Sequence, residues 1–373
     1  MIVKSLCLNN YRNYSDVNLK FSEGVNIFYG DNGQGKTNLV EAIYFCASGR
    51  SHRTSKDSEL IKIGCQKTYV GILANNSVRE NKIEIQIDKT EKKKIKLNEI
   101  PAKKVGELMG VLNAVIFCPE DLLLVKEGPS ERRRLMDIGI SQSRPSYFYD
   151  LQQYLKILSQ KNNLLRGIQG NKKLTDTLEV WNISLAQYGS KIIKYRQEFL
   201  KSLSLIAAAK HYEFTDGKEK LFIDYRPSIK VNMKDSMEDV KGKFLKQLND
   251  VFSKEVEKGI SLVGIQRDDF DIVLDGIDLK HFGSQGQQRT AVLAIKAAEL
   301  EIIKEQTNEL PILLLDDVMS ELDSTRQKLL FNSLKGVQIF ITGTDDLLFR
   351  NLNMDNINFY QVNSGNVLYK NMR

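Results

Sequence analysis

The stretch that decides the fold reads Gly-Asp-Asn-Gly-Gln-Gly-Lys-Thr at residues 30–37. It matches the phosphate-loop pattern G-x-x-x-x-G-K-[ST] at every defined position, and it lies between the apolar run Val25–Tyr29 and a segment with helical spacing. The glycines let backbone N–H groups surround phosphate oxygens, because no Cβ crowds the loop, and the start of the helix adds its positive dipole end. This order of strand, loop and helix predicts a nucleotide-phosphate site in an α/β fold.

The side chains of this segment have separate expected roles. Lys36 should contact the β- and γ-phosphates, which also makes it a candidate catalytic residue, and the Thr37 hydroxyl should ligate Mg²⁺. The expected nucleotide-binding residues here are Gly30, Asp31, Asn32, Gly33, Gln34, Gly35, Lys36, Thr37 and Asn38.

A second apolar strand, Ile312–Leu315, ends in two acidic residues, Asp316 and Asp317. Such a carboxylate lies at the carboxyl edge of the sheet, beside the phosphate loop, where it can hold Mg²⁺ through water. We expect Asp316 to serve the metal and Asp317 to polarise the attacking water. An apolar strand that ends in Asp is common by itself, so this assignment depends on the phosphate loop.

A third segment, Gly-Ser-Gln-Gly-Gln-Gln-Arg at residues 283–289, opens a strongly helical stretch. Free N–H groups and a hydroxyl at a helix start make an anion site, although a plain polar helix cap is the alternative. Ser284 precedes Asp316 by 32 positions, which resembles the signature motif of ABC ATPases. By that analogy, an ATP-dependent homodimer would cover each bound ATP with the partner copy's Ser284, Gln285, Gly286 and Gln287.

The middle of the chain has a different pattern from its ends. Residues 69–100 alternate in the manner of β-strands, whereas apolar residues recur at helical spacing in 151–165 and 181–199. The two helices can pair antiparallel through a turn near 167–171, and two ordinary core helices are the alternative.

These patterns predict a divided architecture. We expect a P-loop ABC-type ATPase head made of residues 1–120 and 255–373, with a mostly helical arm of residues 121–254 inserted between them.

Composition adds only weak limits on function. The 373 residues are 42% hydrophobic and 27% charged, and a net charge of +7 favours a polyanionic partner only modestly. The four cysteines lack metal-site spacing, no secretion signal is visible, and no apolar run approaches the roughly 18 residues of a membrane span. We therefore expect a cytoplasmic protein without a membrane partner. Six lysines in residues 92–104 form its densest basic stretch, for which a solvated face is the alternative to DNA contact.

Several stretches resemble the RecF family, a relative of the SMC heads. They are residues 8–14, 33–43, 117–122, 128–134 and 285–290, and residues 320–323 resemble the D-loop of ABC ATPases. The resemblance covers nearly the whole chain. It implies an ATP-dependent, sequence-independent clamp on duplex and gapped DNA that serves replication and recombinational repair and promotes recombinase loading with RecO and RecR. It also implies that Arg53, after the first helix, contacts the nucleotide.

Some positions depart from these patterns. Gln266 replaces a histidine of the family. Compared with related heads and ABC proteins, Pro119-Glu120 replaces the Q-loop glutamine, Thr344 stands at the switch histidine of transporters, and Asp317 is an aspartate where many ABC proteins have glutamate. A shorter acid, with no His or Gln to orient water, implies slow hydrolysis, so that ATP acts as a timed clamp. A weak, DNA-stimulated ATPase is expected, and whether it functions as an enzyme stays open.

Three other classes of protein share parts of this pattern. The nucleotide-binding subunit of a transporter would carry the switch histidine, which is absent here. A stand-alone P-loop kinase has no use for the segment at 283–289. A related clamp that serves a nuclease would need far longer helices.

Overall fold

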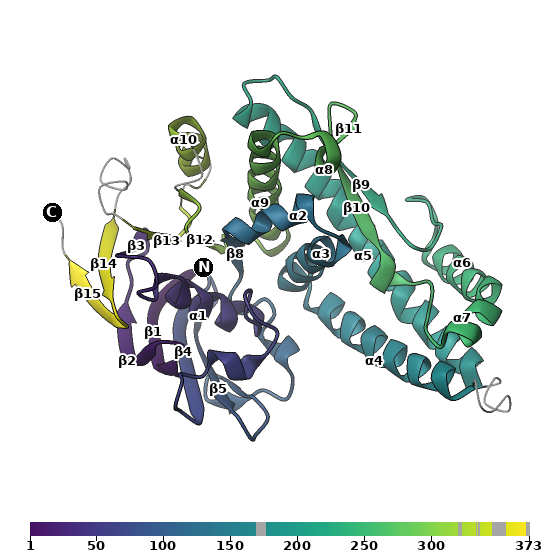
Figure 1. Cartoon of the computed structure of the whole chain (residues 1–373), viewed down its shortest axis with the longest axis horizontal. Coiled ribbons are helices and arrows are strands. Elements are labelled where there is room, and N and C mark those ends of the chain that lie inside the picture. The colour runs from purple at the N-terminus through teal and green to yellow at the C-terminus, as the bar shows by residue number, and fades with distance from the viewer. Residues whose placement is uncertain (169–176, 320–322, 333, 335, 345–355, 371–373) are drawn as a thin grey trace. The chain divides into compact units, whose positions relative to one another are not determined.

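The computed structural model describes residues 1–168, 177–319, 323–332, 334, 336–344 and 356–370 (Figure 1). Packing divides the chain into two compact units. The first, called the head, combines Met1–Asp121 with Lys296–Arg373, and the second, called the arm, is Leu122–Ile295. The first boundary lies within one residue of the predicted one. The second lies at residue 296 instead of residue 255.

The head contains a mostly parallel sheet whose central strands are entirely buried. Strands buried on both faces appear in sequence as continuous apolar runs, which explains why they were recognisable. The strand order is β15-β14-β3-β13-β12-β8, and of these described pairs β14–β15 is the antiparallel one. The strands are β3 (Val25–Tyr29), β8 (Ala114–Phe117), β12 (Ile312–Leu315), β13 (Ile339–Gly343), β14 (Ile357–Asn363) and β15 (Asn366–Lys370).

A second head sheet is antiparallel, in the order β2-β1-β4-β5-β6-β7. Its strands are β1 (Ile2–Tyr11), β2 (Tyr14–Lys20), β4 (Lys67–Asn75), β5 (Glu80–Asp88), β6 (Lys94–Leu97) and β7 (Ile100–Pro101). Helix α1 (Lys36–Ser48) contacts strands of both sheets. All of its residues are therefore buried except Thr37 and Asn38. The head also includes α10 (Ser324–Asn332).

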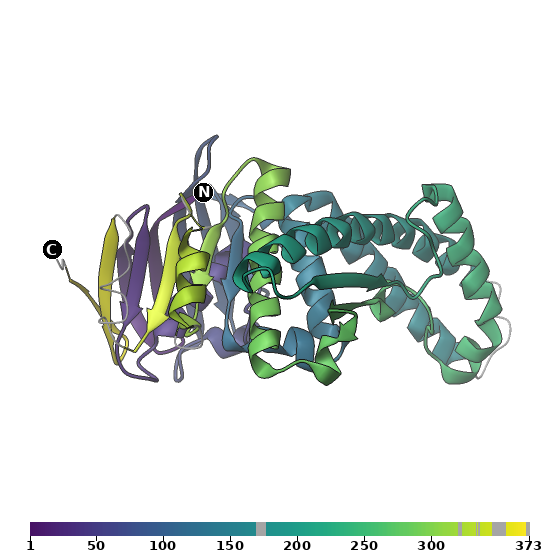
Figure 2. The same ribbon diagram turned by 90° about the horizontal axis from the view of Figure 1, so that it is seen from above.

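The arm is built on two helices that lie side by side, α4 (Pro145–Ile168) and α5 (Thr177–Phe214) (Figure 1 and Figure 2). They are the two helices that the apolar spacing predicts. Of the turn predicted at 167–171, residues 167 and 168 are still helical, and residues 169–171 lie outside the described residues. Gly189 of α5 allows the helix that carries Phe244 to pack closely against α5, because a Cβ on Gly189 would lie 2.5 Å from the Phe244 ring. The other arm helices are α2 (Leu123–Lys126), α3 (Pro129–Ser143), α6 (Met237–Asp250), α7 (Phe252–Lys258) and α8 (Leu279–Phe282).

A small sheet explains why the arm extends past residue 254. Strand β10 (Asp269–Leu274) pairs antiparallel with β9 (Leu221–Arg226) along its whole length, and β11 (Ile277–Asp278) pairs with β10. These hydrogen bonds join residues after 255 to the middle of the chain. The arm therefore also contains the start of the long helix α9 (Gln285–Thr307), which passes into the head at Lys296.

The buried Arg196 of α5 binds the segment around Gln266, the residue that replaces the family histidine. Arg196 donates to the Asp268 carboxylate at 2.7 Å and to Asp137 at 2.8 Å. Nearby, Gln266 accepts a hydrogen bond from the Tyr154 hydroxyl at 2.7 Å and donates to the Val263 carbonyl at 2.9 Å. Gln266 thus has structural partners inside the arm.

None of the described helices combines the length and apolar character that crossing a bilayer requires.

Candidate nucleotide-binding site

The phosphate loop runs from β3 to α1 with three glycines at positive φ, Gly30 at 146°, Gly33 at 79° and Gly35 at 118°. A Cβ on Gly30 would lie 2.3 Å from the Val362 carbonyl oxygen, and one on Gly35 would lie 2.5 Å from the Asn13 amide nitrogen. Glycine at Gly30 and Gly35 is therefore required by the chain's own packing, independently of any ligand.

Residues from the turn between β1 and β2 hold the loop in place. The Asn13 side-chain amide donates to the Gln34 carbonyl at 2.8 Å and accepts from the Asn38 amide at 2.8 Å. The Tyr14 hydroxyl donates to the Gly35 carbonyl at 2.9 Å. Sequence reasoning assigned no role to Asn13 or Tyr14 individually, and only their place in a family-like stretch could have indicated one.

Lys36 is buried, and its ammonium lies inside the loop. Its Nζ donates to the carbonyl oxygens of Gly30 at 2.6 Å and Asp31 at 2.8 Å. Burial lowers the pKa of Lys36, although Asp317, Asp316 and Asp31 act in the opposite direction. The position fits the predicted role, because the cation lies where backbone N–H groups and glycines leave space for phosphate oxygens.

The acidic end of β12 meets the start of α1, as the sequence predicts. The Thr37 hydroxyl donates to Asp316 Oδ1 at 2.9 Å, and the Thr342 hydroxyl of β13 donates to the same oxygen at 2.8 Å. Burial raises the pKa of Asp316 to about 6, despite these two hydrogen bonds. Asp317 adopts φ of 53°, and its N–H donates to the Thr342 hydroxyl at 2.8 Å. Thr342 is thus a site residue that sequence reasoning missed.

The donor set of Thr37 and Asp316 fits a hard cation. Mg²⁺ prefers oxygen ligands, keeps several waters and takes the rest from phosphates, so one hydroxyl and one carboxylate suffice. Among the described residues no cluster of three or more His, Cys, Asp or Glu side chains could hold a metal by itself. A magnesium ion here would accordingly depend on the nucleotide.

Arg53 lies near the phosphate loop, where it interacts with the buried carboxylate of Glu41. Glu41 of α1 is fully buried and accepts hydrogen bonds from Arg12 at 2.6 Å and 2.8 Å and from Ser51 at 2.5 Å. Burial raises the pKa of Glu41, but the Arg12 and Ser51 hydrogen bonds outweigh it and hold the pKa below its ordinary value. Arg53 lies 3.8 Å from Glu41 and donates to the Asn38 side chain at 2.9 Å. Half-exposed, its guanidinium is available to a nucleotide at the start of α1.

The segment Ser284–Gln287, called the signature segment, is the start of α9 and belongs to the arm. The Ser284 N–H donates to Gln287 Oε1 at 2.9 Å, and the Gln287 N–H donates to Ser284 Oγ at 3.3 Å. Ser284, Gln285 and Gly286 are exposed. The predicted helix start is confirmed, and its hydrogen bonds are those of a reciprocal cap.

The basic stretch separates into lysines with different environments. Lys93 is only 15% exposed, forms an ion pair with Asp57 at 2.8 Å and donates to the Gly49 carbonyl at 2.8 Å. Its ammonium also lies 5.1 Å from the centre of the Phe45 ring. Lys92 is exposed. Lys93 is therefore part of the head's packing, so it is the poorest DNA-contact candidate of the run.

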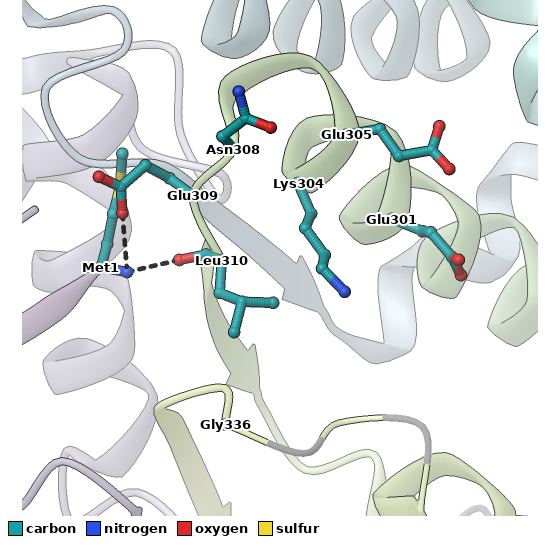
Figure 3. A pocket seen from close by; sticks show the side chains of 8 residues that line it. All are labelled: Met1, Glu301, Lys304, Glu305, Asn308, Glu309, Leu310 and Gly336. Carbon is teal, nitrogen blue, oxygen red and sulfur yellow. Dashed lines mark hydrogen bonds and ion pairs between the residues drawn. The ribbon is translucent and has the colours of Figure 1, made fainter. Parts of the chain in front are cut away.

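A pocket of about 550 Å³ occupies a different part of the head (Figure 3). Its described lining comes from the residue before β1, from the end of α9 and from residues before β12 and β13. These residues are Met1, Glu301, Lys304, Glu305, Asn308, Glu309, Leu310 and Gly336. The Met1 amine donates to the Leu310 carbonyl at 2.7 Å. Leu310 and Gly336 precede their strands, whereas the phosphate loop and Asp316 follow theirs. The pocket thus lies at the amino ends of the parallel strands, whereas the phosphate loop lies at their carboxyl ends.

Known proteins resemble this chain along nearly its whole length. Residues 2–366 match the family model described as the RecF/RecN/SMC N terminal domain. The DNA replication and repair protein RecF of Ruminiclostridium cellulolyticum is 51% identical over 98% of this chain and 99% of that protein. A solved structure of the recombination mediator protein RecF-ATP in the RecFOR pathway has a TM-score of 0.92 and 39% identity, and covers 99% of this chain and 98% of that one.

More distant structures share the fold alone. An Smc head domain with an extended coiled coil from Pyrococcus furiosus has a TM-score of 0.58 and 18% identity over 99% of this chain and 96% of that one. Together with the phosphate loop and the Asp316–Asp317 strand end, this confirms the predicted α/β fold of ABC type. A family model that spans almost every residue, and a relative that shares half of them, show that the chain belongs to the RecF family.

Proposed function

We propose that this chain binds ATP with Mg²⁺ in its head, and that ATP closes two copies into a clamp on DNA during recombinational repair in the cytoplasm. The observation that carries the proposal is the meeting of Lys36, Thr37 and Asp316 at one loop, with Thr37 and Asp316 in direct hydrogen bonding. A relative named as a replication and repair protein and a similar structure named as RecF-ATP support it.

In this proposal each residue of the loop has one task. Backbone N–H groups of residues 30–37 and the Lys36 ammonium bind the β- and γ-phosphates, and Arg53, hydrogen-bonded to Asn38 at the start of α1, contacts the nucleotide. Thr37 and Asp316 would hold Mg²⁺, which supplies charge neutralisation on the phosphates when bound. Asp317 would accept a hydrogen bond from the attacking water and orient it toward the γ-phosphorus. Hydrolysis by this shorter acid would be slow and would reset the clamp.

The exposed signature segment supports a dimer. Apart from its chain neighbours and the backbone of its own helix, the nearest described atom to a Cβ added to Gly286 would be Ser284 Oγ, at 4.0 Å. Glycine lowers the stability of a helix by up to about 1 kcal/mol relative to alanine, so it has no internal advantage here. A close approach by a group from outside the chain would explain it. The proposed group is the γ-phosphate of ATP held by a second copy, with the N–H groups of α9 and the Ser284 hydroxyl as donors.

The proposed partners follow from the same clamp. A closed dimer would grip the phosphates of duplex or gapped DNA without reading bases, and RecO- and RecR-type mediators would use it to promote recombinase loading. The exposed Lys92 is a candidate phosphate contact, and Lys93 is not.

The decisive experiment measures the molar mass of the full chain by light scattering with ATP and with ADP. ATP should produce a dimer and ADP should not, because the γ-phosphate is what the signature segment reaches. Ser284→Arg should keep nucleotide binding and lose the dimer, whereas Asp317→Asn should keep binding and trap the dimer. A Ser284→Arg protein that still dimerises with ATP would overturn the composite-site proposal.

A further inference from the structure

The last residue of the signature segment is held from outside the segment. Gln287 Nε2 donates to Glu219 Oε1 at 3.0 Å, while Gln287 Oε1 accepts the Ser284 N–H at 2.9 Å. A carboxylate can only accept, so this hydrogen bond decides which end of the Gln287 amide faces Glu219 and which faces Ser284. The orientation of the cap on Ser284 therefore depends on Glu219.

Glu219 has a second fixed partner. Its Oε2 lies 3.0 Å from Nε2 of His211, which is fully buried in the last turn of α5. Burial lowers the pKa of His211, although the hydrogen bond to Glu219 acts in the opposite direction. Because a carboxylate only accepts, Nε2 of His211 donates to it. One oxygen of Glu219 thus serves His211 and the other serves Gln287.

The backbone around Glu219 is also fixed by hydrogen bonds. The next residue, Lys220, donates its N–H to the Asp275 carboxylate at 3.0 Å, and the Asp275 N–H donates to the Lys220 carbonyl at 3.0 Å. Asp275 begins the tight turn between β10 and β11, at φ of 50°. These hydrogen bonds therefore fix the backbone next to Glu219 at the arm sheet. The side chain of Glu219 is 22% exposed.

The hydrogen bonds leave the Ser284 hydroxyl ready to donate. Ser284 Oγ accepts the Gln287 N–H, so that oxygen is oriented by the helix and its proton remains available to an outside acceptor. If the Gln287 side chain were released, the Ser284 N–H would lose its acceptor and the first turn of α9 would loosen.

We propose that Glu219 is a positioning residue for the signature segment: held by His211, its carboxylate orients the Gln287 amide and keeps Ser284 and the N–H groups of α9 arranged for a phosphate. This inference rests on the proposed function, in which that phosphate is the γ-phosphate of ATP on a second copy. Glu219 touches no nucleotide itself.

The test compares three variants of the full chain. Glu219→Ala removes the acceptor, whereas Glu219→Gln keeps an amide oxygen that can accept from Gln287. Glu213→Ala is the matched control, because Glu213 is an exposed carboxylate in the last turn of α5. ATP-dependent dimerisation should weaken about tenfold to a hundredfold in Glu219→Ala, and by less than about threefold in Glu219→Gln and in the control.

Two further readouts separate positioning from folding. Affinity of the monomer for ATP should stay at the parent value in all variants, because the phosphate loop belongs to the head. Amide hydrogen exchange without nucleotide should accelerate at residues 284–288 in Glu219→Ala, and not in Glu219→Gln or Glu213→Ala. Gln287→Ala removes the same hydrogen bond from its other end and should reproduce both effects, which keeps the test valid if Glu219→Ala folds poorly.

Distinct outcomes would overturn the two proposals. Parent-like dimerisation and exchange in Glu219→Ala, or a Glu219→Gln protein as weak as Glu219→Ala, would overturn the positioning role. A parent chain that never dimerises with ATP would overturn the proposed function, and the exchange measurement would still decide whether Glu219 orders the signature segment.

Discussion

A glycine in the phosphate loop and a glycine in the signature segment have contrasting surroundings. Gly35 lies in a loop that its own chain surrounds, where a Cβ would come within 2.5 Å of Asn13 and within 2.8 Å of Tyr14. Gly286 lies at an exposed helix start, where, apart from its chain neighbours and the backbone of its own helix, the nearest described atom to an added Cβ is 4.0 Å away. The first glycine is explained by internal packing, and the second is not.

The difference shows how far each segment depends on the rest of the molecule. The phosphate loop receives hydrogen bonds from Asn13, Tyr14 and Ser364, which together fix it before a ligand arrives. The signature segment is capped by its own Gln287 and exposes its donors. The proposed composite site would explain the exposed Gly286, with the other half of that site on a second copy.

Exchanging each glycine for alanine gives the sharpest contrast. Gly35→Ala places a Cβ against Asn13 at a φ of 118°, so we expect unfolding to become easier by about 2–4 kcal/mol and ATP binding to be lost. Gly286→Ala should leave stability equal or higher by up to about 1 kcal/mol, with normal ATP binding but no dimer. Urea unfolding and light scattering test both. A Gly286→Ala protein that dimerises normally would remove the contrast.

Removal of the loop's cation should affect the head alone. Lys36→Met deletes the ammonium that lies at the Gly30 and Asp31 carbonyls, and we expect ATP affinity to fall about a hundredfold or more. Isothermal titration with ATP measures the loss. Hydrogen exchange at residues 284–288 should not change, because those hydrogen bonds lie within the arm, and a change there would contradict the independence of the two segments.

Asp316 makes the stability of the head depend on pH. Its pKa is raised to about 6 by burial, above the unfolded value near 4, so its buried charge destabilises the head at higher pH. The penalty is relieved as pH falls from about 6 to about 4, because the folded state then takes up the proton first. Asp316→Asn should therefore exceed the parent in stability by about 1–3 kcal/mol near pH 8, and the difference should vanish near pH 4. Unfolding of both proteins across this range tests it, and equal stability near pH 8 would contradict it.

The lysine run repeats the contrast on a smaller scale. Lys93→Ala removes an ion pair, a backbone hydrogen bond and a ring contact, and should cost about 1 kcal/mol of stability. Lys92→Ala should leave stability unchanged and, if Lys92 contacts a DNA phosphate, should reduce the slope of log affinity against log salt by about one. Filter binding at several salt concentrations measures the slope. An unchanged slope would place Lys92 outside the DNA contact.

The candidate nucleotide site could be predicted from adjacent residues. The spacing of Gly30, Lys36 and Thr37 and the acids after β12 were sufficient, because a phosphate loop and a buried parallel strand are local patterns of adjacent residues. The start of α9 at Ser284 was equally visible, since a helix cap involves neighbours three positions apart.

The contacts that hold these segments in place could not be predicted in this way. Thr342 meets Asp316 across 26 positions, Asn13 meets Gln34 across 21 and Gln287 meets Glu219 across 68, and no periodicity encodes such pairings. The boundary at residue 296 had the same origin, because β9 and β10 pair across more than forty positions and hold the signature segment in the arm. Local patterns identify the candidate site residues, whereas hydrogen bonds between distant segments of the chain hold those residues in position.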